Sequence, residues 1–217
     1  MSGPGEAATS GASDSSTEAP AERRFDYDRT VALSDGVFAI ALTLLVLNIG
    51  VPVLGSGHEG VLGQRLLDHG EEYFSYALGF AVIGLLWVRH HTFFREIDHI
   101  DRRLTVMNLV YLGLIAFLPY PTRILGLYGN QPAAVIMYAT VTATVSIVAR
   151  IQTVHALRAG LLTEAGCREV RRRENWAIVP AVFVVSIPIA LASPRAALYC
   201  WSLLFILPFL QRRLRAR

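Results

Sequence analysis

Long apolar stretches separated by short polar segments dominate the chain from residue 31 to residue 211. A helix needs about 20 mainly apolar residues to cross the hydrocarbon core of a membrane. Six stretches meet this length to within a few residues, and each predicts a spanning helix: 31–50, 73–93, 105–125, 133–152, 176–193 and 196–211. The pattern therefore predicts an all-α integral membrane protein with six transmembrane helices per subunit.

Prolines modify two of these predicted helices. Pro119 and Pro121 lie late in the third stretch, where we expect a kink or local unwinding, because proline lacks an amide donor and clashes with the preceding turn. The last two stretches are separated only by Ser193, Pro194 and Arg195. These two helices must therefore form a tight hairpin.

The two ends of the chain differ from its apolar body. Residues 1–24 are rich in Ser, Gly, Ala, Glu and Pro and carry no large apolar residue after Met1, which predicts a disordered N-terminal tail. This segment also lacks the apolar centre of a cleavable signal peptide. We expect one transmembrane domain over residues 25–211, followed by a basic tail over residues 212–217.

The arginines indicate an orientation for the predicted helices. All 20 Lys and Arg residues are arginine, and segments rich in arginine alternate with segments that are poor in it. Because positive residues favour the cytoplasmic side, both termini are expected in the cytoplasm of a multi-pass protein in the cell membrane. The clusters at 171–173 and in the C-terminal tail are interpreted first as topology signals, with binding of anionic lipids as the alternative.

Composition narrows the classes of function. The chain is 53% hydrophobic and only 17% charged, whereas soluble domains carry about a quarter charged residues. Cys167 lies in an arginine-rich loop and Cys200 in an apolar stretch, which favours neither a disulfide framework nor a metal site. We expect no nucleic-acid partner and no metal or cofactor.

Three polar residues mark the start of the first apolar stretch: Arg29, Ser34 and Asp35. An ionisable residue at the mouth of a spanning helix is costly and indicates a functional or structural partner. Asp35 lies five residues before Ile40, about 140° away around a helix, so the two side chains cannot both face one narrow axis. The alternative is simple helix capping by Ser34 and Asp35.

Partners for these residues are present in the next two stretches. Trp87 and His90 lie on one helical face, and Asn108 lies near the start of the third stretch. The orientation given above places all of them near one depth, which predicts a polar network of Arg29, Ser34, Asp35, Trp87, His90 and Asn108. For the His90–His91 pair, a membrane-interface position without a ligand is favoured over metal binding.

Ile40, Leu44 and Leu47 form a stripe along the first stretch, at i, i+4 and i+7, and Thr43 lies near it. Almost every residue around them is apolar, so no amphipathic face can be recognised. From periodicity alone, the stripe is ordinary packing against the core or lipid.

The segment RTVALSDGVFAIALTLLVLNI, with Arg29, Ser34 and Asp35, resembles the signature of the TMEM175 family of potassium channels. The third stretch, NLVYLGLIAFLPYPTRILG, and the W-x-x-H of Trp87 and His90 resemble its prokaryotic members. The resemblance covers residues 25–211. Leu33 replaces the phenylalanine that precedes Ser-Asp in the family, which affects aromatic packing at that point.

This resemblance implies a homotetramer of six-helix subunits with the first helices around a central pore. It implies passive conduction of K+ in preference to Na+, with K+ as the permeant ion, and no enzymatic activity. Ile40 would form the narrowest ring, Leu44 and Leu47 would follow, and Thr43 would add a hydroxyl beside the path. The residues around Ser34 and Asp35 would hold the pore helices in place.

Three other functions compete with this expectation. A secondary transporter would use Asp35 or His90 as a coupling site, and it usually carries an internal repeat; none is convincing here. A membrane enzyme would need a nucleophile with its base, or a metal set, and the sequence shows neither. A non-conducting membrane scaffold is the third.

Overall fold

The computed structural model describes residues 15–52, 62–172, 178–198, 200 and 201. Within these ranges the regular structure is helical, apart from one isolated β-bridge between Ile97 and Leu162. The helices are α1 (Ser15–Leu44), the 3-10 helix η1 (Leu45–Asn48), α2 (Leu62–Asp68), α3 (Gly70–Arg95), α4 (Arg102–Phe117), α5 (Pro119–Tyr128), α6 (Pro132–Arg158), α7 (Glu164–Arg172) and α8 (Ile178–Ala192). The prediction of an all-helical fold is confirmed for these residues.

Among the described residues, four helical segments are long and apolar enough to cross a membrane: Tyr27–Asn48, Gly70–Arg95, Arg102–Tyr128 and Pro132–Arg158. They correspond to the first four predicted spans. The fifth predicted span contains α8, whose apolar part, Pro180–Ala192, is shorter than a full membrane crossing. Most of the sixth, residues 202–211, lies outside the described residues. Six spans per subunit therefore stay a prediction.

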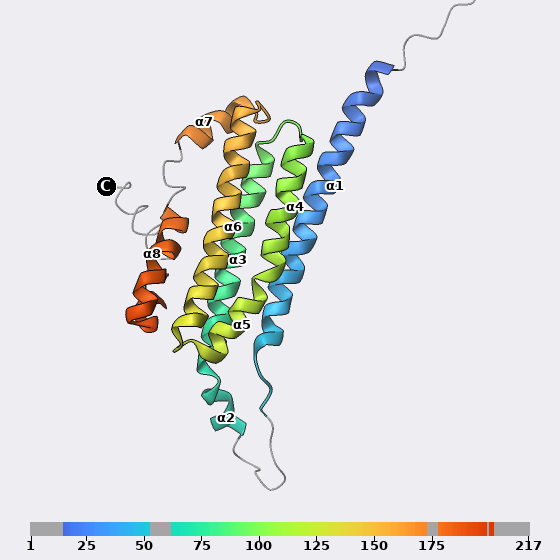
Figure 1. Ribbon diagram of the computed structural model, residues 1–217. Coiled ribbons are helices and arrows are strands. Elements are labelled where there is room, and N and C mark those ends of the chain that lie inside the picture. Colours follow the sequence, from blue (N-terminus) through green and yellow to red (C-terminus); the bar gives the residue numbers. More distant parts are fainter. Residues whose placement is uncertain (1–14, 53–61, 173–177, 199, 202–217) are drawn as a thin grey trace, which may run out of the picture.

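The first helix begins earlier than expected. Residues 15–24, which the sequence assigned to a disordered tail, are helical and continue directly into the spanning part of α1. Extending an existing helix avoids the cost of nucleation, and Ala, Glu and Arg are good helix formers. In Figure 1, α1 projects beyond the other helices at this end. Residues 1–14 of the predicted tail and the tail at 212–217 lie outside the described residues.

The third predicted span is broken at its prolines, as expected. α4 ends at Phe117 and α5 begins at Pro119, with Leu118 between them. Proline is tolerated in the first turn of a helix because its missing amide would have no intrahelical partner there. Figure 1 shows α5 turned away from the line of α4. The turn brings α5 against α3 and α6.

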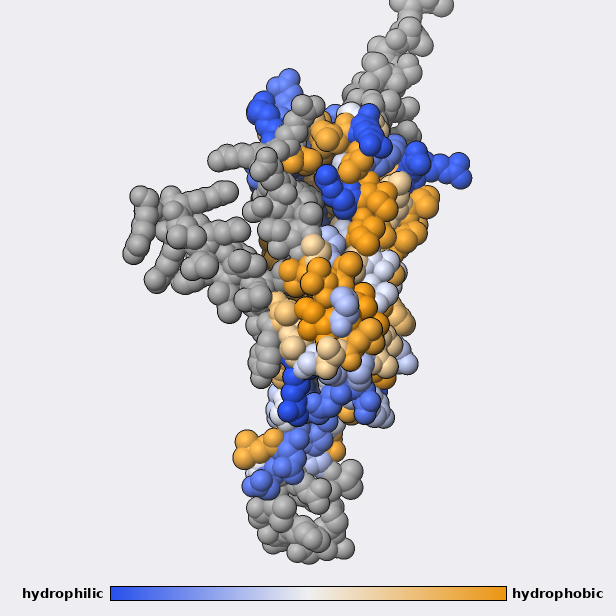
Figure 2. Space-filling model, turned by 60° about the vertical axis from the view of Figure 1, so that its left-hand side comes forward, coloured by the Kyte–Doolittle hydropathy of each residue, from blue (hydrophilic) through white to orange (hydrophobic). Residues whose placement is uncertain are grey.

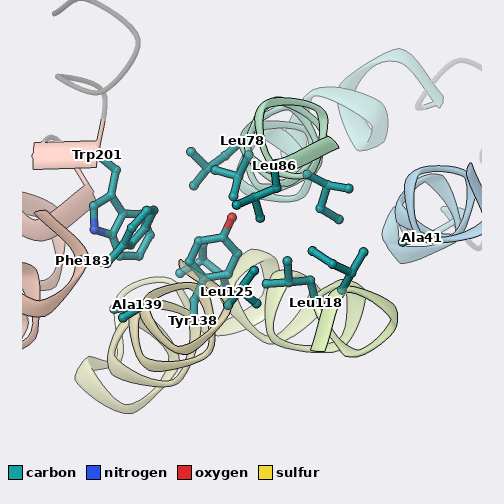
Figure 3. Close-up of a cluster of buried hydrophobic side chains, with 14 of the residues drawn as sticks. Ala41, Leu78, Leu86, Leu118, Leu125, Tyr138, Ala139, Phe183 and Trp201 are labelled. Carbon is teal, nitrogen blue, oxygen red and sulfur yellow. The ribbon is translucent and has the colours of Figure 1, made fainter. Parts of the chain in front are cut away.

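The main core forms where α6 packs against α4 and α5 on one side and α8 on the other. Tyr138 of α6 lies 5.1 Å, between ring centroids, from Trp201, and Phe183 of α8 lies 5.4 Å from the same indole. Figure 3 shows these three rings together, with the Tyr138 hydroxyl directed toward Leu78 and Leu86 of α3. All three rings are fully buried. This aromatic cluster packs α8 and Trp201 against α6.

A second, smaller core closes one end of the bundle. It combines residues from the ends of α3 and α6 with residues of the adjoining loops and α4: Phe93, Phe94, Ile97, Leu104, Ala156, Leu161 and Leu162. The backbones of the two loops are joined, because the Asp98 amide donates to the Leu161 carbonyl and the Thr163 amide donates to the Glu96 carbonyl, each at 2.9 Å. These contacts fix the α3–α4 loop to the α6–α7 loop.

Polarity is arranged in bands along the bundle. Figure 2 shows, on the face in view, a hydrophobic band between two hydrophilic ends. The ends of α3 and α6 and the start of α4 lie together at one end (Figure 1). The arginine-rich segments therefore gather at one end of the bundle. This agrees with the alternation in the sequence, and the cytoplasmic location of that end stays a prediction.

Candidate functional site

The spanning part of α1 has one buried face and one exposed face. Ser34, Phe38 and Ala41 of α1, and Leu45 at the start of η1, are buried at helical spacing against α3, α4 and α5. The opposite face exposes the predicted pore stripe. Because both faces are mostly apolar, only the packing of the neighbouring helices separates them.

Three buried polar side chains form a hydrogen-bonded chain across three helices. Asn108 of α4 donates through Nδ2 to Ser34 Oγ of α1 at 3.1 Å. Its Oδ1 accepts from His90 Nε2 of α3 at 2.9 Å. Ser34 in turn donates to the Thr30 carbonyl at 2.8 Å. Each residue satisfies a polar group of the next, which is the condition for burying such groups in an apolar interior.

Asp35 makes a separate contact with the second spanning helix. Its Oδ1 accepts a hydrogen bond from Trp87 Nε1 at 2.9 Å. Trp87 stacks on His91, with ring centroids 5.4 Å apart. Asp35 therefore contacts α3. A charge-assisted bond of this kind ties α1 to α3 beside the buried chain.

These bonds bring together five of the six predicted network residues, in two groups: Ser34–Asn108–His90 and Asp35–Trp87. The sixth, Arg29, lies about one turn before Ser34. It lines an open groove between α1 and the start of α4, together with Asp101 and Arg102. The structure thus places Arg29 at the same end of the bundle, next to the network.

Aromatic rings that the sequence analysis did not single out surround His90. Tyr111 stacks on His90 at 5.3 Å and an interplanar angle of 10°, Phe94 stacks on it at 4.4 Å, and Phe38 packs at 5.5 Å. Tyr111 follows Asn108 by three residues, and Phe38 follows Ser34 by four. A search for aromatic residues one turn after each polar residue would have found both.

The predicted pore residues project away from the described bundle. The exposed fractions are 61% for Ile40, 41% for Leu44 and 71% for Leu47. Thr43 is also exposed, and its hydroxyl donates to the Ile40 carbonyl at 2.9 Å. Of the two kinds of packing that periodicity alone allowed, packing against the core of the same subunit does not apply to these side chains, whereas packing against lipid agrees with their exposure.

The far end of the spanning segment Tyr27–Asn48 is also anchored. Asn48 donates through Nδ2 to the carbonyl of Pro119 at 3.0 Å. The amide of Gly50 donates to Glu72 Oε2, and His69 Nδ1 lies 2.6 Å from Glu72 Oε1. The break before α5 thus presents a backbone carbonyl to η1. Both ends of the exposed stripe are held by polar contacts to other helices.

The site contains polar pairs but no arrangement for metal binding: within the described ranges, no three His, Cys, Asp or Glu side chains are grouped so that they could hold an ion. The bonds from Asn108 to Ser34 and from His90 to Asn108 both run between helices, whereas the Ser34 hydroxyl donates within α1. These bonds between helices fix the rotation of α1 about its own axis.

Comparisons with known proteins match the same region. Residues 29–119 match the family model described as the endosomal/lysosomal potassium channel TMEM175. A potassium channel of Streptomyces collinus is 40% identical over 119 residues, which cover 55% of this chain and 57% of the relative's length. A potassium channel of Chamaesiphon minutus is 36% identical over 148 residues, which cover 67% of this chain and 72% of that relative.

The fold is similar to a solved structure as well. The crystal structure of a lysosomal potassium-selective channel TMEM175 homolog from Chamaesiphon minutus superposes with a TM-score of 0.71 at 29% identity, covering 86% of this chain and 97% of that one. The residues that match the family model include Arg29, Ser34 and Asp35 of α1. They also include Trp87, His90 and Asn108. The chain is therefore a membrane protein that belongs to the TMEM175 family.

Proposed function

We propose that this protein is a potassium-selective cation channel, assembled as a homotetramer with α1 of each subunit around a central pore. The observation that carries the proposal is the exposed stripe of Ile40, Leu44 and Leu47 on a helix whose other face is fixed by buried polar contacts. The two bacterial relatives are named potassium channels, and the solved relative is described as potassium-selective.

Several copies are needed because one subunit has only one α1. A single helix cannot surround a path for ions, whereas symmetric copies of an exposed stripe can. In a tetramer each α1 would turn its stripe toward the axis, and the remaining helices would separate the pore from lipid. Six spanning helices per subunit, with both termini in the cytoplasm, complete the proposed arrangement.

The proposed constriction is hydrophobic. The chain contains no TVGYG segment, which supplies the carbonyl rings of ordinary potassium filters. A narrow ring of isoleucine makes an ion shed part of its water without offering replacement ligands. Because K+ holds its water less strongly than Na+, this cost is lower for K+, and a preference follows. Leu44 and Leu47 would extend the apolar path, and Thr43 would place an oxygen beside it.

The polar contacts then have a mechanical role. The Ser34–Asn108–His90 chain and the Asp35–Trp87 bond hold α1 at one rotation, so that Ile40 faces the axis. A rotation of only one residue position, about 100°, would remove the ring. The buried polar residues thus determine which apolar residue meets the ion.

The proposal is tested by replacing Ile40 with Asn in purified protein reconstituted into bilayers, with K+ and Na+ on opposite sides. The reversal potential should move toward zero, because the amide offers ligands to both ions. The matched control is Leu191→Asn on α8, a similarly exposed leucine outside α1. An unchanged K+ preference in Ile40→Asn would remove Ile40 from the filter, and saturable, proton-coupled flux would favour a transporter.

A further inference from the structure

An open pocket lies at the end of the bundle opposite the arginine-rich end, between the start of α3, the α5–α6 turn and the segment after α8 (Figure 1). Its volume is about 400 Å³, which is within the usual range of ligand pockets. Apolar side chains of its lining are Phe74, Leu125 and Leu198, and its charged and amide side chains are Glu71, Asn130 and Arg195. An apolar lining with a few polar groups is typical of a site for a small molecule.

One amide side chain connects the two charged groups of the pocket. Arg195 Nε donates to Asn130 Oδ1 at 3.1 Å, and Asn130 Nδ2 donates to Glu71 Oε1 at 3.3 Å. The ion pairs among the described residues do not include one between Glu71 and Arg195. Both charged side chains are exposed, and each has polar atoms beyond those that bond to Asn130: a second carboxylate oxygen and two Nη groups. The pocket therefore presents a negative and a positive group side by side, held apart by Asn130.

The position of these residues along the chain indicates the depth of the pocket in the membrane. Each lies at an end of an apolar helical segment: Glu71 in the first turn of α3, Asn130 between α5 and α6, and Arg195 just after α8. Tyr73 and Tyr128, close in sequence to two of them, are exposed, and tyrosine is enriched where a membrane meets water. The polar side of the pocket therefore lies at the depth of lipid headgroups.

The segment after α8 places one wall of the pocket far from α1. Figure 1 shows α8 and α1 on opposite sides of the bundle. In the proposed tetramer, with α1 at the axis, the side that carries α8 would lie outermost and meet lipid. Lipid is therefore the neighbour expected at Arg195 and Leu198.

The two opposite charges select the kind of lipid. Every phospholipid headgroup carries a phosphate, which guanidinium groups bind through charge-assisted hydrogen bonds. A primary ammonium also supplies donors for the Glu71 carboxylate, whereas a trimethylated ammonium has no N–H to donate. An anionic headgroup would be attracted by Arg195 but repelled by Glu71. The charges of the pocket thus match a headgroup that carries both a phosphate and a primary ammonium.

We propose that this pocket binds a zwitterionic phospholipid with a primary ammonium, such as phosphatidylethanolamine. The phosphate would contact Arg195, the ammonium would contact Glu71, and the start of an acyl chain would pack against Phe74 and Leu198. The bound lipid would join α3 to the segment after α8. Binding at this pocket does not depend on ion conduction.

The test uses the full chain, purified in a neutral detergent, and follows its thermal unfolding midpoint as lipid is added. Phosphatidylethanolamine, phosphatidylcholine and phosphatidylglycerol with the same acyl chains are compared. We expect a saturable rise with phosphatidylethanolamine, at an apparent affinity about tenfold or more above that of the other two, since each of them loses a hydrogen bond to a charged group. No rise, equal rises with all three lipids, or a preference for either of the other two would overturn the proposal.

Glu71→Gln tests which group selects the headgroup. The substituted amide can still accept from Asn130, but its charge is gone. This variant should lose the preference for phosphatidylethanolamine and bind phosphatidylglycerol at least as well, because Arg195 remains. Asp68→Asn is the matched control, because Asp68 is an exposed carboxylate close to the start of α3 and outside the pocket lining. The same change of preference in Asp68→Asn would show a general effect of surface charge and overturn the assignment.

Arg195→Met tests the contact with the phosphate. It should weaken the apparent affinity for phosphatidylethanolamine by about tenfold or more. Arg123→Met is the control, because Arg123 is an exposed arginine of α5 outside the pocket lining, and equal weakening in both variants would contradict the site. Circular dichroism confirms folding, and the comparison of lipids on the wild type decides even if a variant misfolds.

Discussion

Asn108 donates a 3.1 Å hydrogen bond to Ser34, a residue 74 positions earlier in the chain, and so joins α4 to α1 in the interior of the bundle. The same amide accepts from His90 of α3. One side chain thus fixes three helices relative to one another.

Replacing Asn108 with Leu should strongly destabilise the fold. The change leaves Ser34 without its donor and the ring of His90 without its acceptor, and each orphaned group costs about 1–3 kcal/mol. The measurement is the free energy of unfolding in a denaturant titration of purified protein. Leu109→Ala, an exposed neighbour, should cost much less, and a similar loss in both variants would contradict the central role of Asn108.

The Asp35–Trp87 bond should show energetic coupling. Asp35→Asn weakens the acceptor and Trp87→Phe removes the donor, so a double-mutant cycle isolates their interaction. We expect a coupling energy of about 0.5–1.5 kcal/mol, with the two changes less than additive. Combining Asp35→Asn with the distant Leu191→Ala should be additive. Full additivity of Asp35→Asn with Trp87→Phe would show that the bond contributes nothing.

Gly79 allows α3 and α5 to approach closely. A Cβ atom at Gly79 would lie 2.7 Å from Cγ2 of Thr122, whose hydroxyl is bonded to the Leu118 carbonyl and whose side chain therefore cannot rotate freely. Gly79→Ala should destabilise the protein by about 1–3 kcal/mol, the usual cost of overpacking.

The matched control for this prediction is Gly84→Ala on the same helix, where a Cβ would meet nothing within 4 Å. That change should be neutral or stabilising by up to about 1 kcal/mol, because alanine favours a helix. Thermal unfolding midpoints of the two variants should therefore move in opposite directions. A stabilised Gly79→Ala would show that α3 and α5 are not in tight contact.

Asp101 should make stability depend on acid pH. Burial favours its neutral form, but the Leu104 amide, at 2.6 Å, and His155, at 2.8 Å, outweigh burial and hold the pKa of the Asp101 carboxyl below its ordinary value. A lowered folded-state pKa contributes stability above the unfolded-state pKa, and this is lost as the pH falls through the folded-state value.

Unfolding midpoints of the wild type should therefore fall from about pH 4 downward, near the ordinary pKa of aspartate. Asp101→Asn should flatten this decline, since asparagine still caps α4 but carries no charge. Asp98→Asn, in the same loop but exposed, is the control and should leave the decline unchanged. An identical acid profile in Asp101→Asn and wild type would contradict the prediction.

The sequence alone located the spanning helices. Residues 31–50, 73–93, 105–125 and 133–152 were recognisable because a membrane needs a fixed length of apolar chain, and the structure places a helix over each. The prolines marked the break between α4 and α5. The boundary of the N-terminal tail was wrong for residues 15–24, because composition does not show where a neighbouring helix will extend.

Partners in the polar network were only partly predictable. Depth along the membrane follows from counting residues, and it placed Ser34, Asp35, Trp87, His90 and Asn108 together. Which of them bond to one another depends on how α1, α3 and α4 cross, and no local pattern records those crossings. The pairing of Asp101 with His155, 54 residues apart, has the same origin.

The face of α1 that carries Ile40 shows this limit most clearly. In a membrane helix both faces are apolar, because lipid and the protein interior have similar polarity. The hydrophobic pattern therefore does not show which face packs against the other helices. The sequence determines that α1 spans the membrane and that the polar residues Ser34 and Asp35 precede Ile40. Packing against α3, α4 and α5 determines that Ser34 and Phe38 turn inward and that Ile40, Leu44 and Leu47 stay exposed.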